Sequence, residues 1–284
     1  MRKLIFYISF LSFVFISCTK EVNVNLPETD SQLVIEGWIE QGKYPIVYLT
    51  KSKKYTDKID SSNFLNYIAS VAKVTVSNNY NSEVLTLKLN QNQFPFYYYE
   101  GTEILGEIGD TYTIKVELSG KTYEGSTTIL PSVSLTKYEF QPVENDTTKK
   151  FINIQFQDPP EVKNYYRVYI KRLNKDHSYK PCYLSTINDV GFNGESFSYQ
   201  IVRNYSSSLQ EDDTRYFVQG DSVMVKFCAI DQKTHDYWKT IDGLIAVSAN
   251  PFGLSTNTPL SNFTNDALGI FYGLSSKNYL IVIK

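Results

Sequence analysis

The chain has 284 residues, of which 42% are hydrophobic and 15% aromatic, and its formal net charge is −2. This apolar content supplies a packed core and argues against a disordered chain. A weakly acidic chain without a block of basic residues is not expected to bind nucleic acid.

The first residues have the pattern of a signal peptide. Two basic residues precede an apolar run, 4–16, of about 13 residues, shorter than the roughly 20 that a membrane-spanning helix needs. An apolar run of this length after a positive start is typical of a secretory signal. The run ends in "FISC", which resembles a bacterial lipobox. We therefore expect a lipoprotein signal peptide over 1–17 and a lipidated Cys18, with an ordinary signal peptide as the alternative.

A polar stretch, "TKEVNVNLPETD", follows Cys18 and predicts a flexible tether over 18–31. Each buried lipid CH₂ contributes about 0.8 kcal/mol, so two or more acyl chains such as palmitate hold a soluble domain at a membrane stably. The Lys-acidic start of this tether resembles the surface-export signals of Bacteroidota lipoproteins. We expect an outer-membrane protein, lipid-anchored and exposed at the cell surface, although a periplasmic facing is the alternative.

Alternation with a period of two dominates the first half of the chain after the tether. The runs "QLVIEGWIE" and "YPIVYLT" predict two strands joined by a turn, and "EVLTLKLN" predicts one strand with its leucines on one face. The string "GDTYTIKVELSGKTYEGSTTILP" predicts a hairpin that turns at Ser119-Gly120. About seven short strands over 32–131 are the number expected of one immunoglobulin-like β-sandwich.

A second series of strands follows over 132–284, ending in the separate runs "LGIFYGL" and "NYLIVIK". One stretch in this half predicts a helix near 235–248, because its apolar residues recur at helical spacing and Thr234 is a good N-cap. We therefore predict an all-β protein made of two tandem immunoglobulin-like sandwiches, the second with one short amphipathic helix.

Six strings together resemble one family, the Bacteroidota outer-membrane lipoproteins grouped as domain of unknown function DUF4249. They are "LVIEGWI", the hairpin string above, "FQDPPEVKNYYRVYI", "DVGFNGESF", "GDSVMVKFCAIDQKTHDYWKTI" and "SNFTNDALGIFYGLSSKNYLIVI". The resemblance spans about 33–283. It implies a lipoprotein that is often encoded beside a TonB-dependent outer-membrane transporter, and it implies no catalytic residue.

Signals of catalysis and of metal binding are weak. The chain has two histidines, His177 and His235, and neither lies in a zinc-binding pattern. Neither G-x-S-x-G nor a suitable S-x-x-K motif is present. We therefore expect no enzyme activity, no metal and no cofactor, with a hydrolase as the least surprising exception.

Aromatic residues are the strongest candidates for binding. In a strand, Phe96 and Tyr98 of "FPFYYYEG" point to one side, and Tyr97 and Tyr99 to the other. We interpret Tyr97, Tyr99 and, in "NYYRVYI", Tyr166 as exposed rings for a ligand or partner. The alternative is that these tyrosines reflect the β-propensity of half-buried sheet positions. Trp38 and Trp238 are expected in the core.

Two cysteines remain beside Cys18. Cys182 and Cys228 both lie in predicted strands, and outside the cytoplasm they can form a disulfide or stay as two buried thiols. The sequence leaves both readings open.

Three functions fit these patterns. The first is a non-enzymatic lipoprotein accessory to a TonB-dependent transporter protein in nutrient capture or uptake. The second is a stand-alone module that binds a glycan or a peptide. The third is a structural lipoprotein of an envelope or secretion assembly.

Overall fold

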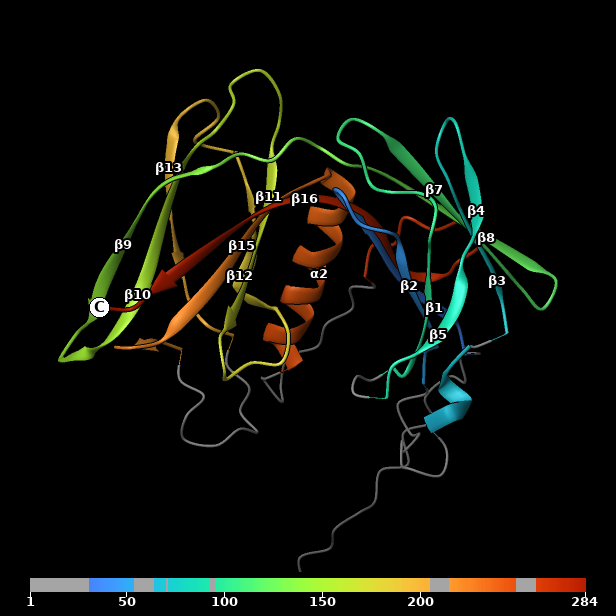
Figure 1. Cartoon of the computed structure of the whole chain (residues 1–284), viewed down its shortest axis with the longest axis horizontal. Coiled ribbons are helices and arrows are strands. Elements are labelled where there is room, and N and C mark those ends of the chain that lie inside the picture. Colours follow the sequence, from blue (N-terminus) through green and yellow to red (C-terminus); the bar gives the residue numbers. More distant parts are fainter. Residues whose placement is uncertain (1–30, 54–63, 70, 92–94, 205–214, 249–258) are drawn as a thin grey trace, which may run out of the picture. The chain divides into compact units, whose positions relative to one another are not determined.

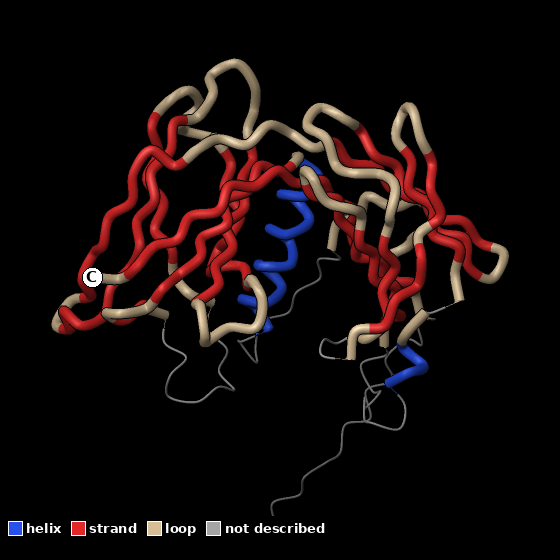
Figure 2. The backbone as a smooth tube through the Cα atoms, viewed as in Figure 1, coloured by secondary structure: helices blue, strands red, loops and turns tan. Residues whose placement is uncertain are grey.

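The computed structural model describes residues 31–53, 64–69, 71–91, 95–204, 215–248 and 259–284, and for 245–248 the backbone alone. Strands dominate these residues, as the sequence predicts, and α2 (Gln232–Ser248) is the one long helix among them (Figures 1 and 2). A short 3-10 helix, η2 (Phe64–Tyr67), is the other helical element in the described ranges. The expected lipidation residue, Cys18, lies outside the described ranges.

The strands form three sheets. The largest has eight strands in the order β12-β11-β15-β16-β1-β2-β6-β5. Their bounds are β12 (Lys180–Asn188), β11 (Tyr165–Arg172), β15 (Ser222–Ile230), β16 (Leu268–Val282), β1 (Leu33–Glu40), β2 (Ile46–Lys51), β6 (Tyr97–Glu100) and β5 (Thr86–Leu89). A second sheet has the order β4-β3-β7-β8, with β4 (Ser82–Val84), β3 (Lys73–Ser77), β7 (Thr111–Leu118) and β8 (Lys121–Thr128). The third joins β13 (Ser196–Ile201), β10 (Asp146–Gln157), β14 (Phe217–Val218) and β9 (Leu135–Val143).

The long strand β16 connects the two halves of the chain. It pairs in parallel with β1 along 268–274 and antiparallel with β15 along 275–282. The sequence predicted two strands here, and that detail is wrong. The polar residues between the two apolar runs are accommodated within a continuous strand, because Ser275 is buried and donates a hydrogen bond to the Leu130 carbonyl. The chain from Ser31 to Lys284 forms one compact unit. The predicted division into sandwiches 32–131 and 132–284 stays a prediction.

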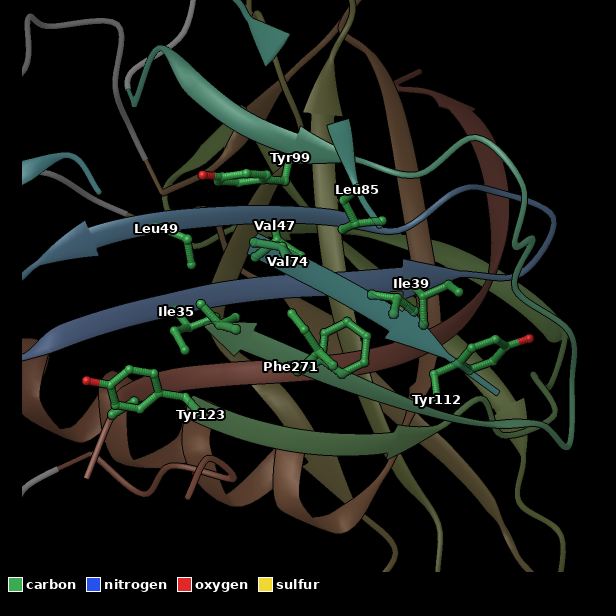
Figure 3. Close-up of a cluster of buried hydrophobic side chains, with 14 of the residues drawn as sticks. Ile35, Ile39, Val47, Leu49, Val74, Leu85, Tyr99, Tyr112, Tyr123 and Phe271 are labelled. Atoms are coloured by element: carbon green, nitrogen blue, oxygen red, sulfur yellow. The ribbon is translucent and has the colours of Figure 1, made fainter. Parts of the chain in front are cut away.

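Hydrophobic side chains collect in three clusters, each between two layers. The first lies between β1, β2 and β6 and the second sheet, and contains Ile35, Ile39, Val74, Ile114 and Phe271 (Figure 3). The second lies in the other half, between the third sheet and β11, β12 and β15, around Phe156, Tyr166 and Phe227. The third lies under α2, around Cys228, Tyr237 and Tyr272. Burial of apolar surface in these layers, at about 25 cal/mol per Å², is the main favourable term in folding.

The predicted strand "EVLTLKLN" is divided between two sheets. Val84 ends β4 of the second sheet and Thr86 begins β5 of the largest one. Leu85 at the crossing is buried, whereas Leu87 and Leu89 are exposed. The expectation of a single strand is therefore wrong, because the chain changes sheet at Leu85 and the alternation is interrupted there.

The start of α2 also differs from its prediction. The helix begins at Gln232, and the side chain of Asp231 accepts hydrogen bonds from the backbone N–H and the hydroxyl of Thr234. Asp231 is therefore the N-cap, and Thr234 occupies the third helical position. An aspartate cap satisfies an unpaired N–H and also complements the helix dipole.

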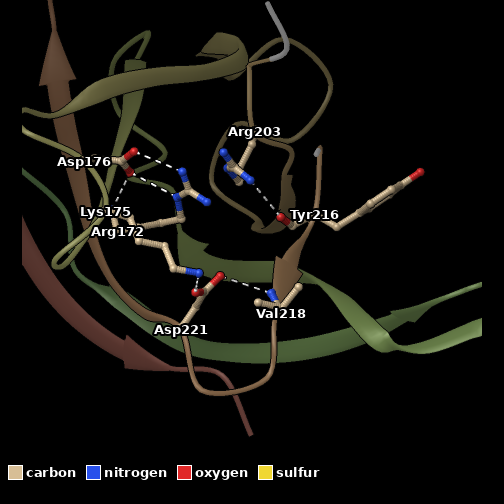
Figure 4. Close-up of polar contacts among 7 residues, drawn as sticks. All are labelled: Arg172, Lys175, Asp176, Arg203, Tyr216, Val218 and Asp221. Atoms are coloured by element: carbon tan, nitrogen blue, oxygen red, sulfur yellow. Dashed lines mark hydrogen bonds and ion pairs between the residues drawn. The ribbon is translucent and has the colours of Figure 1, made fainter. Parts of the chain in front are cut away.

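Polar contacts secure the loops at one end of the third sheet (Figure 4). The guanidinium of Arg172 binds Asp176 in the β11–β12 connection, and Lys175 forms an ion pair of 2.9 Å with Asp221. Asp221 also accepts a hydrogen bond from the backbone N–H of Val218. The β14–β15 turn is thereby tied to the β11–β12 connection.

Candidate functional site

A groove lies between α2 and the outermost strand β12. Its volume is about 510 Å³, within the range of about 300–1,000 Å³ that is typical of ligand sites. Four segments line it, namely β12, the loop 189–195, β13 and α2. The lining residues are Leu184, Thr186, Ile187, Asn188, Val190, Phe192, Phe197, Tyr199, His235, Lys239, Asp242 and Gly243. We call this feature the α2–β12 groove.

Buried acids hold the loop of the groove in place. Asp189 accepts a hydrogen bond of 2.6 Å from the backbone N–H of Asn164. Asp158 accepts one of 3.0 Å from the N–H of Gly194, and the hydroxyl of Tyr166 donates to the same carboxylate. Two of the strings that resemble the family, those with Asp158 and with Gly194, therefore meet in space.

Gly194 is required at its position by two local features. Its φ is +77°, and a Cβ there would lie 2.7 Å from the Cβ of Pro160. A side chain would therefore be strained both by the backbone and by the close contact. Phe192 of the same loop turns inward and stacks on Phe197 of β13 with ring centroids 4.0 Å apart. This pair forms the apolar wall of the groove.

Strand β12 is irregular where it enters the groove. Its register with β11 shifts between the partners of Arg167 and Tyr169, and Leu184 has a φ of +50°. The hydroxyl of Tyr199 donates to the Leu184 carbonyl at 2.9 Å. A bulge of this kind bends an edge strand and redirects its side chains, so Leu184 is left 56% exposed at the rim of the groove.

The helical wall of the groove contains an acid, Asp242, with one unsatisfied oxygen. Oδ2 of Asp242 is buried and accepts no hydrogen bond within the described residues. Burial raises the pKa of Asp242, and the attraction of Arg167 opposes this shift without cancelling it. A buried carboxylate oxygen without a donor is costly, so a donor from a ligand would be favourable here.

Arg167 lies behind this acid, on the face of β11 that α2 covers. Its guanidinium carbon is 3.6 Å from the centroid of the Trp238 ring and 4.7 Å from that of Tyr169. Its Nε donates to Ser185, whereas Nη1 and the indole N–H of Trp238 have no partner within the described residues. The contact with Trp238 attaches α2 to the sheet.

The predicted tyrosines lie elsewhere, and two of them are not exposed. Tyr99 is 4% exposed in the first core cluster, where its hydroxyl accepts from the N–H of Ala72. Tyr166 is 1% exposed in the second cluster. Reading these two as accessible binding residues was therefore wrong, because the inner face of each strand carries them. Tyr97 is partly buried and lies outside the groove.

Tyr98, the neighbour of Tyr99 in β6, is partly exposed. It stacks on Tyr48 at 5.8 Å, Tyr48 stacks on Trp38 at 5.8 Å, and Trp38 stacks on Tyr272 at 6.1 Å. This row of rings crosses β6, β2, β1 and β16. Trp38 is partly buried within it and packs against the cluster under α2, as does Trp238. The row therefore continues the aromatic packing of this cluster across β1 and β2 to β6.

Cys182 and Cys228 are both free and buried. They cannot form the disulfide that the sequence left open, because β11 lies between their strands. The two side chains also belong to clusters on opposite faces of the sheet. Burial raises the pKa of each thiol to about 12, so neither is a reactive nucleophile at neutral pH.

The remaining candidates are the two histidines. His177 is exposed in a turn, and His235 is buried against Tyr165 and hydrogen-bonded to Asp236. Within the described ranges, no group of three or more His, Cys, Asp or Glu residues could hold a metal ion. No helix in the described part of the chain is long and apolar enough to cross a bilayer.

Sequence reasoning missed the groove. Its members come from three separate stretches of the chain, around 184–199, 235 and 239–243. One signal was present in the sequence: Gly243 lies in the interior of a predicted helix, where glycine is unfavourable and so points to a packing or functional reason.

Comparison with known proteins supports one assignment. No curated protein matches the chain. The model of the family described as Domain of unknown function (DUF4249) matches residues 19–279. The match begins directly after Cys18 and includes all the described strands apart from the last residues of β16. The chain belongs to the DUF4249 family.

Proposed function

We propose that this chain is a non-enzymatic outer-membrane lipoprotein, exposed at the cell surface, that assists a TonB-dependent transporter in capturing or admitting a nutrient. The observation that carries the proposal is Cys18, which follows Ser17 at the end of an apolar run, 4–16, of signal-peptide length. Acyl chains on Cys18 would hold the compact unit, 31–284, at the membrane, joined by a short polar tether.

The α2–β12 groove supports a binding role rather than a catalytic one. Its walls are mainly apolar and aromatic, and its polar groups include Asp242, whose Oδ2 has no hydrogen-bond partner among the described residues. A preformed apolar groove with a few polar groups is the usual form of a binding site. The same groove favours the second candidate, a stand-alone module that binds a peptide or a glycan without a transporter.

The test is crosslinking in intact membranes. Cells that produce the tagged full-length protein are treated with a reversible crosslinker, and the purified product is examined for a plugged β-barrel protein. The proposal expects such a protein to be recovered with the parent and lost with Cys18→Ser. Recovery of the parent alone would contradict the accessory role.

Two further measurements complete the test, namely growth of a deletion strain and the accessibility of the protein from outside the cell. Deletion of the gene should impair growth on one nutrient and leave envelope integrity unchanged, whereas loss of integrity would favour a structural lipoprotein. Protease added to whole cells should degrade the protein if the unit faces outward, and protection would place it in the periplasm.

A further inference from the structure

Strand β12 presents an open edge to the groove. It is the outermost strand of the largest sheet and pairs there with β11. Before the bulge its Tyr183 N–H bonds to the Val202 carbonyl, so the open part of the edge is 185–188. The backbone N–H of Asp189 donates to the Asn164 carbonyl. From there along β12, residues whose backbone N–H and C=O groups point toward β11 alternate with residues whose backbone groups point away from it. By this alternation Thr186 and Asn188 direct their backbone N–H and C=O groups away from β11, and both residues line the groove.

Open edges are positions at which another polypeptide can add a strand, and proteins usually protect them with charges, prolines or covering loops. Here the edge is bordered by exposed apolar residues instead. Val190 is 79% exposed and Leu184 56% exposed. Exposed apolar side chains beside an open strand edge are typical of an interaction site.

The groove has different walls above and below this edge. The layer of β13 contributes an aromatic wall, made of Phe192, Phe197 and Tyr199. The helix α2 contributes a polar wall with Lys239 and Asp242. Side chains of an added strand alternate between the two sides of the sheet. One set would therefore meet the apolar wall and the other would meet the helix.

Asp242 indicates which kind of side chain a bound segment should direct toward α2. Its buried Oδ2 lacks a hydrogen-bond donor within the described residues, and a basic side chain supplies both a donor and the complementary charge. Gly243 beside it leaves room, since nothing lies within 4 Å of where its Cβ would be.

We propose that the α2–β12 groove binds an extended segment of a partner polypeptide, which adds as a strand to Thr186 and Asn188. The segment alternates apolar residues with polar ones, and one of the polar residues is a lysine or arginine that reaches Asp242. The edge from Ser185 to Asn188 accommodates about four residues at 3.3 Å each. This inference goes beyond the proposed function and does not depend on the lipid anchor.

The test uses fluorescein-labelled octapeptides that alternate valine, leucine or phenylalanine with lysine, and matched peptides with glutamate or serine in place of lysine. Binding to the full-length protein in detergent is followed by fluorescence anisotropy. At least one lysine peptide should bind saturably, and at least tenfold more tightly than its glutamate counterpart. Methylation of every second backbone nitrogen of the peptide should abolish binding when these nitrogens face β12. Methylation of the intervening nitrogens should leave binding unchanged.

Two variants locate the binding. Thr186→Pro removes a backbone N–H on the open side of an edge strand, where proline is tolerated, and should weaken binding at least tenfold. Gly243→Phe should fill the groove and do the same, whereas Leu89→Phe, which places a ring at an exposed position of β5 outside the groove, is its control and should bind as the parent does. Circular dichroism checks that each variant is folded.

Three outcomes would overturn the inference. The first is that no alternating peptide binds, and the second is that binding survives both Gly243→Phe and Thr186→Pro. The third is that the parent sediments as a dimer that Thr186→Pro dissociates, which would make a second copy of the chain the occupant. Loss of the transporter contact with peptide binding intact would refute the proposed function alone.

Discussion

Glu40 connects the two halves of the chain, and its removal should be among the most destabilising single changes. It ends β1 and is 5% exposed. Its carboxylate accepts hydrogen bonds from Lys43 and Lys226, both at 2.8 Å, and from the hydroxyl of Ser276 at 2.6 Å. Lys226 lies in β15 and Ser276 in β16, so one carboxylate ties β1 to both strands.

The expected loss of stability follows from the burial of the Glu40–Lys226 ion pair. The side chain of Lys226 is 14% exposed, and removal of one partner from a buried ion pair costs about 3–5 kcal/mol. Because Lys226 keeps some contact with water, we expect the lower end, about 3 kcal/mol, for Glu40→Ala. Glu40→Gln keeps an acceptor for Ser276 and should cost about 2 kcal/mol. The matched control is Glu117→Gln, because Glu117 forms only exposed pairs and its loss should cost less than about 1 kcal/mol.

The contribution of Glu40 should also depend on pH. Burial by itself would raise the pKa of Glu40, but the attraction of Lys226 and the three hydrogen bonds hold it below the ordinary value of 4.5. A group with a lowered folded-state pKa stabilises the protein above its unfolded pKa and loses this effect as the pH falls through the folded value. The difference between the parent and Glu40→Gln should therefore be full at pH 7 and shrink below pH 4.5.

Urea denaturation followed by tryptophan fluorescence measures both effects. The reasoning is refuted if Glu40→Gln unfolds within 0.5 kcal/mol of the parent at pH 7, a difference of about the size expected for surface substitutions. It is also refuted if the difference between the two proteins grows as the pH falls from 7 to 4.

Three further predictions concern α2 and the sheet beneath it. Gly243→Ala should raise the free energy of unfolding by up to about 1 kcal/mol, because alanine is the better helix former and has room there; a loss in urea denaturation would show that the position is crowded. Arg167→Lys should lower it by about 1–2 kcal/mol through loss of planar stacking on Trp238, and an unchanged urea midpoint would contradict the role of that contact. Cys182 and Cys228 should resist Ellman's reagent at pH 8 and react once urea unfolds the chain, since burial raises the pKa of each thiol to about 12; rapid reaction of the folded protein would mean that they are accessible.

Strand positions and the helix could be predicted from the sequence because they depend on local patterns. The hairpin string became β7 and β8, which turn at Ser119-Gly120 where both residues have positive φ. The helix near 235–248 became α2. Amphipathic spacing and turn residues determine such elements within a few positions.

Partners of the strands could not be predicted in the same way. A period of two identifies which residues share a face, but not which face is buried. Tyr98 and Tyr99 are equally compatible with either side, and only packing against Leu85 and Val74 places Tyr99 inward. Likewise, the sequence gives no sign that β16 pairs with both β1 and β15.

The groove depends on tertiary contacts throughout. Its edge exists because β12 ends the sheet, and its polar wall exists because α2 packs beside that edge. Asp242 is an ordinary helix residue in the sequence, and only its burial without a donor marks it.

The proposed anchoring of this protein depends on acyl chains carried by Cys18. Cells are labelled with an alkyne analogue of palmitate, and the purified parent and Cys18→Ser proteins are compared for label and for partition into detergent. The account predicts a labelled, detergent-partitioning parent and a variant that has lost both properties. A parent that takes up no label would contradict the anchor and, with it, the proposed function.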